Sequence, residues 1–169
     1  MQTRIAAAVS SIAAALWLGG LVALGAFAAP VVFSAVPAPL SADAMTVVFR
    51  RFDRAAMACA AIVCLVEVWR ASVARVSRTD LARTAVGVVA GLLAVWGGAF
   101  LSPRIEALHR GGAVRGFGDA GVELEAVHHR AEGAAKAEVV LLAIYLALLA
   151  GAGARRIGPR RPAPDAAPS

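Results

Sequence analysis

The chain has 169 residues, of which 60% are hydrophobic and only 17% are charged. That share of charge is too small to coat a soluble domain of this length, so a soluble globular protein is excluded. The net charge of +6 comes almost entirely from arginine, with Lys136 as the only lysine. No basic stripe interleaved with aromatic residues is present, so a nucleic-acid partner is not expected.

Four apolar stretches divide the chain, and each is long enough to cross a bilayer as a helix. No charged residue lies between Arg4 and Asp43 or between Arg83 and Arg104, and runs of that kind suit lipid on all sides. The sequence therefore predicts an all-α fold, a four-helix transmembrane bundle in one domain over residues 1–154. The expected spans cover residues 5–29, 45–70, 84–103 and 134–154, and an Arg/Pro-rich disordered tail is expected at 155–169.

Prolines punctuate the chain where two of these spans are expected to end, at Pro30 and at Pro103. The first span also begins with a basic residue, Arg4, and contains a small-x-small motif at 26–28, which is typical of a cleaved signal peptide. Its apolar stretch is longer than a signal peptide needs. A retained span is the prediction, and cleavage is the alternative.

The first and third spans share a short motif. Residues 25–30 have the pattern Gly-Ala-Phe-x-x-Pro, and residues 98–103 repeat it. In both halves a polar stretch and a second helix follow the proline. This predicts two duplicated helical hairpins, an arrangement that transporters often use.

Charge around the spans predicts the orientation. Basic residues are almost equally divided between the two sides, but acidic residues concentrate on the side of the two long loops. We therefore predict a multi-pass protein of the cell inner (plasma) membrane, with cytoplasmic N- and C-termini.

Glu67 is interpreted as the only acid in or near a span, with Arg70 three residues later. Trp69 beside them is typical of an interfacial anchor. The sequence therefore predicts a structural Glu67–Arg70 pair at the membrane surface, with ion handling as the alternative.

A histidine-rich segment precedes the fourth span. His128 and Glu132 share a helix face, and so do His129 and Glu132. These three residues are the candidate metal ligands. A His–Glu pair on one helix face supplies two ligands, and a zinc site needs a third from another position, such as His109, Asp119 or Glu125. The alternative is that they are solvated groups. No cofactor is predicted outright, and copper, zinc or haem are the open alternatives.

Polar residues at the starts of the second and fourth helices are expected to meet on the outer face, with Arg50 paired to Glu132. This outer-face polar cluster comprises Arg50, Arg51, Arg54, His128, Glu132 and Lys136.

No nucleophile–base pair, phosphate loop or dinucleotide motif is present in the sequence, so nothing calls for an enzyme. The prediction is a non-enzymatic membrane protein that acts in transport or in membrane-protein association, with lipid and another copy or another membrane protein as partners. The alternative is a metal- or haem-linked redox or copper-handling component that uses His128.

The motifs Trp17-Leu18-Gly19-Gly20 and Pro30-x-x-Phe33, together with Phe49, Pro103 and His128, resemble the transmembrane-protein-205-like family. The resemblance covers residues 10–150 and implies a four-helix membrane domain of uncharacterised function. That family is distantly similar to the copper resistance protein D-like membrane domains, which implies copper handling. Where the family has Leu-His-x-x-Ser, this chain has Ala131 in place of the serine.

Overall fold

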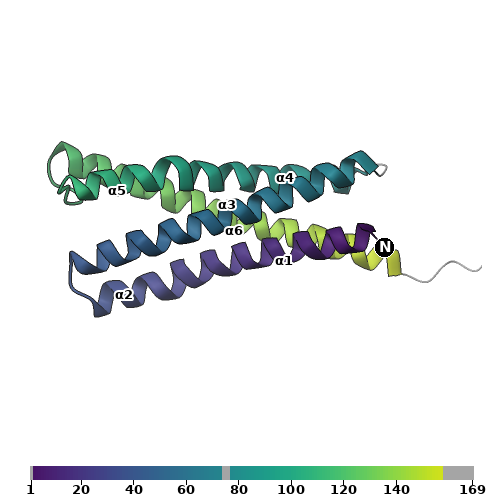
Figure 1. Ribbon diagram of the computed structural model, residues 1–169, viewed down its shortest axis with the longest axis horizontal. Coiled ribbons are helices and arrows are strands. Elements are labelled where there is room, and N and C mark those ends of the chain that lie inside the picture. The colour runs from purple at the N-terminus through teal and green to yellow at the C-terminus, as the bar shows by residue number, and fades with distance from the viewer. Residues whose placement is uncertain (1, 74–76, 158–169) are drawn as a thin grey trace, which may run out of the picture.

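The computed structural model describes residues 2–73 and 77–157, which form four long helical rods without a strand in these ranges (Figure 1). This confirms the predicted all-α four-helix fold. The rods consist of α1 (Gln2–Val22), the π-helix η1 (Ala23–Ala28) and α2 (Ala29–Ala35); α3 (Leu40–Val73); α4 (Arg78–Trp96), the π-helix η2 (Gly97–Leu101) and α5 (Ser102–Arg110); and α6 (Gly118–Ile157).

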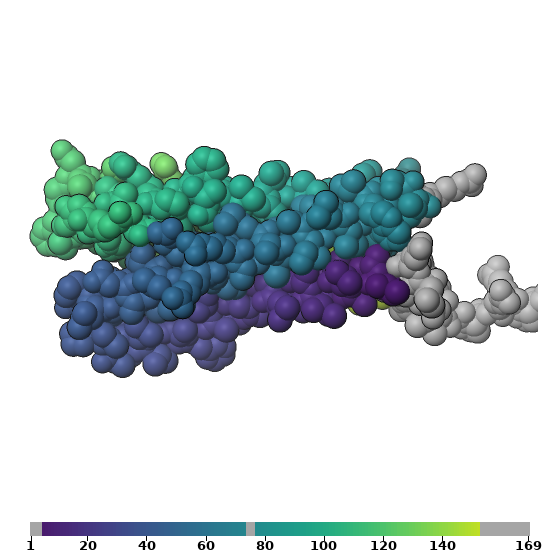
Figure 2. All heavy atoms as spheres, in the orientation of Figure 1, coloured from purple at the N-terminus to yellow at the C-terminus, as the bar shows by residue number. Residues whose placement is uncertain are grey.

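The rods pack as a four-membered ring. α1 packs against α3 and α6, and α4 packs against the same two helices, so that α3 and α6 face each other across a diagonal. The start of α1 and the end of α6 lie at one end of the bundle, here called the terminal end (Figure 1). Residues 36–39 and 111–117 connect the rods at the opposite end, here called the loop end. Figure 2 shows a face on which α3 runs between the first and third rods.

All four of these described rods are long and apolar enough to span a membrane. Their outward surfaces carry large apolar side chains, such as Ile12, Leu65 and Phe100, each more than half exposed. Burying such side chains in lipid removes the cost of exposing them to water. The fold is therefore that of a multi-pass membrane protein. The third rod, Arg78–Arg110, is about 50 Å long, against about 30 Å for a hydrocarbon core, so its ends project beyond the lipid.

The core is built from stripes of buried residues that recur every three or four positions, the spacing of one helix face. In α6 the stripe comprises Leu124, Val127, Ala134, Glu138, Leu142, Tyr145 and Leu149. In α3 it comprises Ser41, Met45, Ala56, Ala60, Val63 and Glu67. Because the buried residues are small where helices cross, the rods approach closely.

The sequence predicted that helices end at Pro30 and Pro103, but both rods continue past these prolines. A π-helical turn precedes each proline: the Ala29 amide donates to the Leu24 carbonyl, and the Ser102 amide donates to the Gly97 carbonyl. The wider turn shifts the hydrogen-bond register, and each proline then occupies the first turn of the next α-helix, where its missing N–H is not needed. The two copies of the repeated motif thus build the same local structure.

Two glycines of α4 provide close packing within the chain. A Cβ atom at Gly87 would lie 3.2 Å from the Tyr145 ring, and one at Gly91 would lie 3.3 Å from the Cys64 sulfur. The small face of α4 is therefore covered by α3 and α6. α6 continues to Ile157, so residues 155–157 of the expected disordered tail are helical; the rest of that tail, residues 158–169, lies outside the described part of the chain.

Candidate functional site

A buried ionic network closes the terminal end of the bundle. The Glu67 carboxylate accepts from Arg83 Nη2 at 2.8 Å and from Arg83 Nε at 3.0 Å, a two-pronged pair between α3 and α4. The Thr84 hydroxyl donates to Glu67 at 3.0 Å, and the Tyr145 hydroxyl donates from α6 at 2.8 Å. Both Glu67 and Arg83 are 1% exposed. The network, here called the Glu67 cluster, ties three of the four rods together.

Asp80 extends this network toward the start of α4. Its carboxylate accepts from Arg83 Nη1 at 2.7 Å and also forms a capping box with Ser77. The capping box satisfies amide groups that a helix start leaves without partners, and it also holds Asp80 in place for Arg83. Arg83 is thus paired with carboxylates on both sides.

The expected partner of Glu67, Arg70, lies 3.7 Å from it but is the weaker partner. The Nη1 atom of Arg70 is buried and makes no hydrogen bond with any described residue. Arg83, which lies just before the expected third span, instead provides the main counter-charge. Glu67 is therefore buried inside the bundle and is not exposed at the membrane surface.

Glu138 is a second acid inside the bundle. It is 5% exposed, and its Oε2 atom accepts a hydrogen bond of 3.0 Å from Trp17 Nε1, the only donor to Glu138 that the described residues supply. Trp17 itself is 1% exposed. The interpretation of Glu67 as the only acid in or near a span is therefore wrong.

The depth of Glu138 follows from its partner. Trp17 lies in the first span, Ile5–Ala35, about 18 Å along the helix from one end and about 27 Å from the other. No charged residue occurs in that span. The Glu138 carboxyl is thus held against the middle of an entirely uncharged helix.

A third acid, Asp53, lies between Glu138 and the loop end. It is half-buried on α3, and the Ser102 hydroxyl at the start of α5 donates to it at 2.5 Å. A Cβ atom at Gly98 in η2 would lie 3.1 Å from the Asp53 Cβ, so this glycine lets the π-helical turn approach the acid. η2 also packs against α6, the helix that carries Glu138.

An apolar layer separates Glu138 from the Glu67 cluster. Leu142 follows Glu138 by one turn of α6, and Val63 precedes Glu67 by one turn of α3; neither has any exposed surface, and the same holds for Ala90 of α4. Toward the terminal end, Glu138 therefore meets a closed layer of packed side chains.

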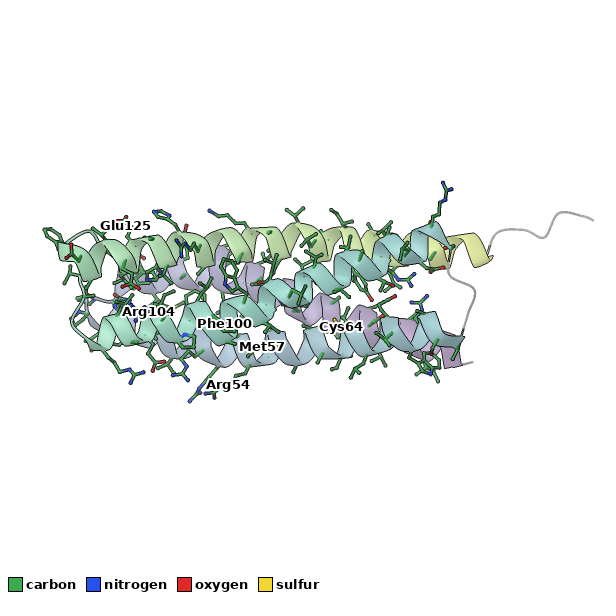
Figure 3. All side chains as sticks on the ribbon, turned by 90° about the horizontal axis from the view of Figure 1, so that it is seen from above. Arg54, Met57, Cys64, Phe100, Arg104 and Glu125 are labelled. Carbon is green, nitrogen blue, oxygen red and sulfur yellow. The ribbon has the colours of Figure 1, made fainter. Side chains whose placement is uncertain are left out.

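The loop end is polar. Arg50 of α3 pairs with Glu106 of α5, and the rings of His109 and His128 meet edge to face at 5.8 Å. A cavity of about 190 Å³ opens beside them, lined by Asp43, Thr46, Val47, Glu106, His109 and Arg110. Figure 3 shows Arg104 and Glu125 toward the same end.

The expected outer-face polar cluster is only partly brought together. Arg50 pairs with Glu106, while Glu132 lies 3.8 Å from Lys136 on its own helix, so the Arg50–Glu132 pair is not formed. The reason is the ring order, in which α3 and α6 are diagonal and α5 lies beside both. Arg51 and Arg54 are exposed, and Arg54 points away from the bundle (Figure 3).

The three candidate metal ligands have separate neighbours. His128 faces His109, His129 lies 3.8 Å from Glu125, and Glu132 lies beside Lys136. Within residues 2–73 and 77–157, no three His, Cys, Asp or Glu side chains converge as a metal site.

A family described as Domain of unknown function (DUF4149) matches residues 12–113 of the chain. No curated protein and no solved structure matches it. The matched range contains Trp17, Asp53, Glu67 and Arg83, whereas Glu138 and Tyr145 follow it.

Proposed function

Because the chain belongs to the DUF4149 family, whose function is unknown, we propose a function from the buried site: the protein is a non-enzymatic transport component of the membrane, and Glu138 binds the transported cation. One observation carries this proposal, the placement of Glu138 inside the bundle with Trp17 as its one hydrogen-bond partner among the described residues.

The free-energy cost of placing an acid such as Glu138 inside a membrane supports a role for it in ion or proton transport. An ionised side chain at the centre of a bilayer costs about 3 kcal/mol or more, and such residues usually mark ion or proton pathways. Glu67 offsets this cost with Arg83, Thr84 and Tyr145, and it is thereby fully occupied in holding the fold. No basic side chain among the described residues pairs with Glu138, so a bound cation is what would neutralise it.

Replacing Glu138 by glutamine should abolish cation flux while leaving the fold intact, because the amide can still accept from Trp17 but cannot hold a charge. The measurement is flux of H⁺, Na⁺ and K⁺ into proteoliposomes, each followed with an internal ion-sensitive dye. The matched control is Glu132→Gln, the same change on the same helix at an exposed position, which should keep the wild-type rate. Wild-type flux equal to that of protein-free vesicles for all three cations would refute the proposal, and so would undiminished flux in Glu138→Gln.

We further propose the inner (plasma) membrane as the location, with both termini in the cytoplasm. Basic residues on the side of the termini lie in short segments next to the span ends, and this supports the orientation, because such segments favour the cytoplasm when they carry Lys or Arg. In a cysteine-free background, a single cysteine at position 113 should react with an impermeant reagent on intact cells, and one at position 77 should not. Both positions lie outside the α-helices, at opposite ends of the bundle. Labelling of 77 alone would reverse the orientation.

A second candidate function is a copper-handling or redox component, which the finer resemblance to the transmembrane-protein-205-like and copper resistance protein D-like families would favour. The approach of His109 and His128 beside the loop-end cavity supports it. Two imidazoles are fewer than the three protein ligands that a catalytic zinc site uses, and copper(I) prefers sulfur ligands, so this candidate ranks second. Metal analysis and an absorption spectrum of the purified protein test it, and a colourless, metal-free protein whose stability ignores added copper would refute it.

A further inference from the structure

We propose that the cation bound by Glu138 is a proton, and that it reaches Glu138 from the loop end through Asp53 while the Glu67 cluster keeps the terminal end closed. This inference rests on the proposed role of Glu138, and it adds the identity of the cation, the side of entry and a relay residue.

The surroundings of Glu138 fit a proton better than a metal ion. Sodium, magnesium or calcium requires several oxygen ligands, about six for the divalent ions. Glu138 instead faces an N–H donor from Trp17, which cannot ligate a cation, and the described residues hold no group of three acidic, His or Cys ligands. A proton needs only one carboxylate lone pair. The donor of this proton is water or the Asp53 carboxylic acid. The O–H bond of the donor breaks as an O–H bond forms on Glu138, and no atom changes its oxidation state.

The groups that face Glu138 leave Asp53 as the candidate relay. The span of α1 brings no charge, and η2 is also uncharged. The charged residues of α4 (Arg78, Asp80 and Arg83) belong to the terminal end, whereas those of α5 (Arg104, Glu106, His109 and Arg110) belong to the loop end. On α6 itself, Glu132 and Lys136 are exposed. Asp53 of α3 remains: it is half-buried, and Gly98 of η2, the turn that packs against α6, approaches it closely.

The polar path continues from Asp53 to the surface. Ser102 donates to Asp53 at 2.5 Å, and one turn further along α5, Glu106 lines the loop-end cavity. In the opposite direction, Val63, Ala90 and Leu142 are fully buried. Beyond them, both Glu67 oxygens already accept hydrogen bonds. Proton access is therefore one-sided in the state that the structure describes.

Trp17 provides a built-in reporter, because its indole N–H donates directly to Glu138. The experiment uses protein in which Ala113→Cys supplies the one cysteine. Trp69→Phe and Trp96→Phe remove two partly exposed tryptophans and leave Trp17 as the only one. The protein is reconstituted into phospholipid vesicles, and labelling of a single cysteine at 113 measures the fraction of molecules with the loop end outside. A rapid external pH step is then applied while Trp17 emission is followed.

The fraction of Trp17 emission that shifts promptly should equal the fraction of molecules with the loop end outside. Glu138→Gln should abolish the shift, and Asp53→Asn should slow it about tenfold or more, in line with the loss of a proton-transfer group. Asp119→Asn, an exposed acid at the same end, should leave the rate unchanged.

Three results would overturn the inference: a prompt fraction that matches the molecules with the terminal end outside, a prompt response of all molecules, or an Asp53→Asn rate equal to wild type. Each can occur while Glu138→Gln still abolishes flux, in which case the proposed function survives and only the route fails. A pH-insensitive Trp17 together with glutamine-sensitive Na⁺ or K⁺ flux would replace the proton with a metal cation.

Discussion

Replacement of Arg83 by methionine is expected to lower the free energy of unfolding by about 3–5 kcal/mol, the usual cost of removing one partner from a buried ion pair. The substitution leaves the Glu67 carboxylate 1% exposed, with only the Thr84 and Tyr145 hydroxyls as strong donors. Arg70, at 3.7 Å, is too far away to replace the two hydrogen bonds from Arg83. Thermal and denaturant unfolding in detergent micelles measures the loss.

Two matched variants distinguish the loss of the pair from the loss of a bulky side chain. Arg104→Met removes an arginine of the same rod from an exposed ion pair with Glu123, 53% and 43% exposed, and should cost at most about 1 kcal/mol. The double variant Glu67→Leu with Arg83→Met removes both charges and should recover most of the stability lost in Arg83→Met. If the double variant is less stable than the single one, the pair is not what makes Arg83 important.

The four helices were predictable because lipid-facing rods need long apolar runs, and such runs are visible without any knowledge of packing. The continuation of the helices past Pro30 and Pro103 was not predictable in this way. A proline predicts a break only when the preceding turn is α-helical, and the π-helical turns at Ala23–Ala28 and Gly97–Leu101 remove that conflict. The repeated Gly-Ala-Phe-x-x-Pro motif indicated only that both prolines would have the same local backbone structure.

The buried charges were also present in the sequence as a pattern. Glu138, Leu142, Tyr145 and Leu149 recur at helical spacing on one face of α6. Glu138 falls inside the expected span 134–154, but Glu67 was nevertheless interpreted as the only acid in or near a span. Arg83 likewise begins the stripe of α4. A charged residue at a position of the buried stripe, where an apolar residue is expected, was the sequence signal that its side chain is buried.

Which helices lie next to each other could not be predicted from a single sequence. The duplicated hairpins indicate that α3 and α6 occupy equivalent places, and equivalence suggested contact between Arg50 and Glu132. In the ring, equivalent helices lie opposite each other, so each forms its ion pairs with adjacent rods or within itself. The hydroxyl of Tyr145 on α6 reaches across the ring to α3, at the Glu67 cluster.

That geometry makes the two ends of the bundle differ in strength. The terminal end is held by a buried ionic network, whereas the loop end depends on a few exposed or half-buried pairs and on the contact between residues 111–117 and α6. Local stability decides which part of a structure opens more easily, and in this bundle that is the loop end. The loop end is therefore where a single small substitution should have a large effect.

Gly121→Ala is expected to destabilise the protein by about 1–3 kcal/mol through overpacking at the loop end. A Cβ atom at this position would lie 2.0 Å from the Val114 carbonyl oxygen, and the obstacle is backbone that cannot rotate away. The same contact includes a hydrogen bond from the Gly116 amide to the Gly121 carbonyl, at 3.2 Å. The segment must move off α6, so trypsin should cleave after exposed Arg115 faster than in wild type.

The control is Gly133→Ala, three turns further along the same helix. Nothing lies within 4 Å of a Cβ atom there, and the position is exposed. Alanine has the higher helix propensity, so this variant should gain about 0.5–1 kcal/mol and show wild-type cleavage after Arg115. The two substitutions are chemically identical, so opposite signs would isolate the contact with Val114 as the cause. If Gly121→Ala instead stabilises the protein as Gly133→Ala does, residues 111–117 are not docked on α6, and the closed geometry of the loop end is wrong.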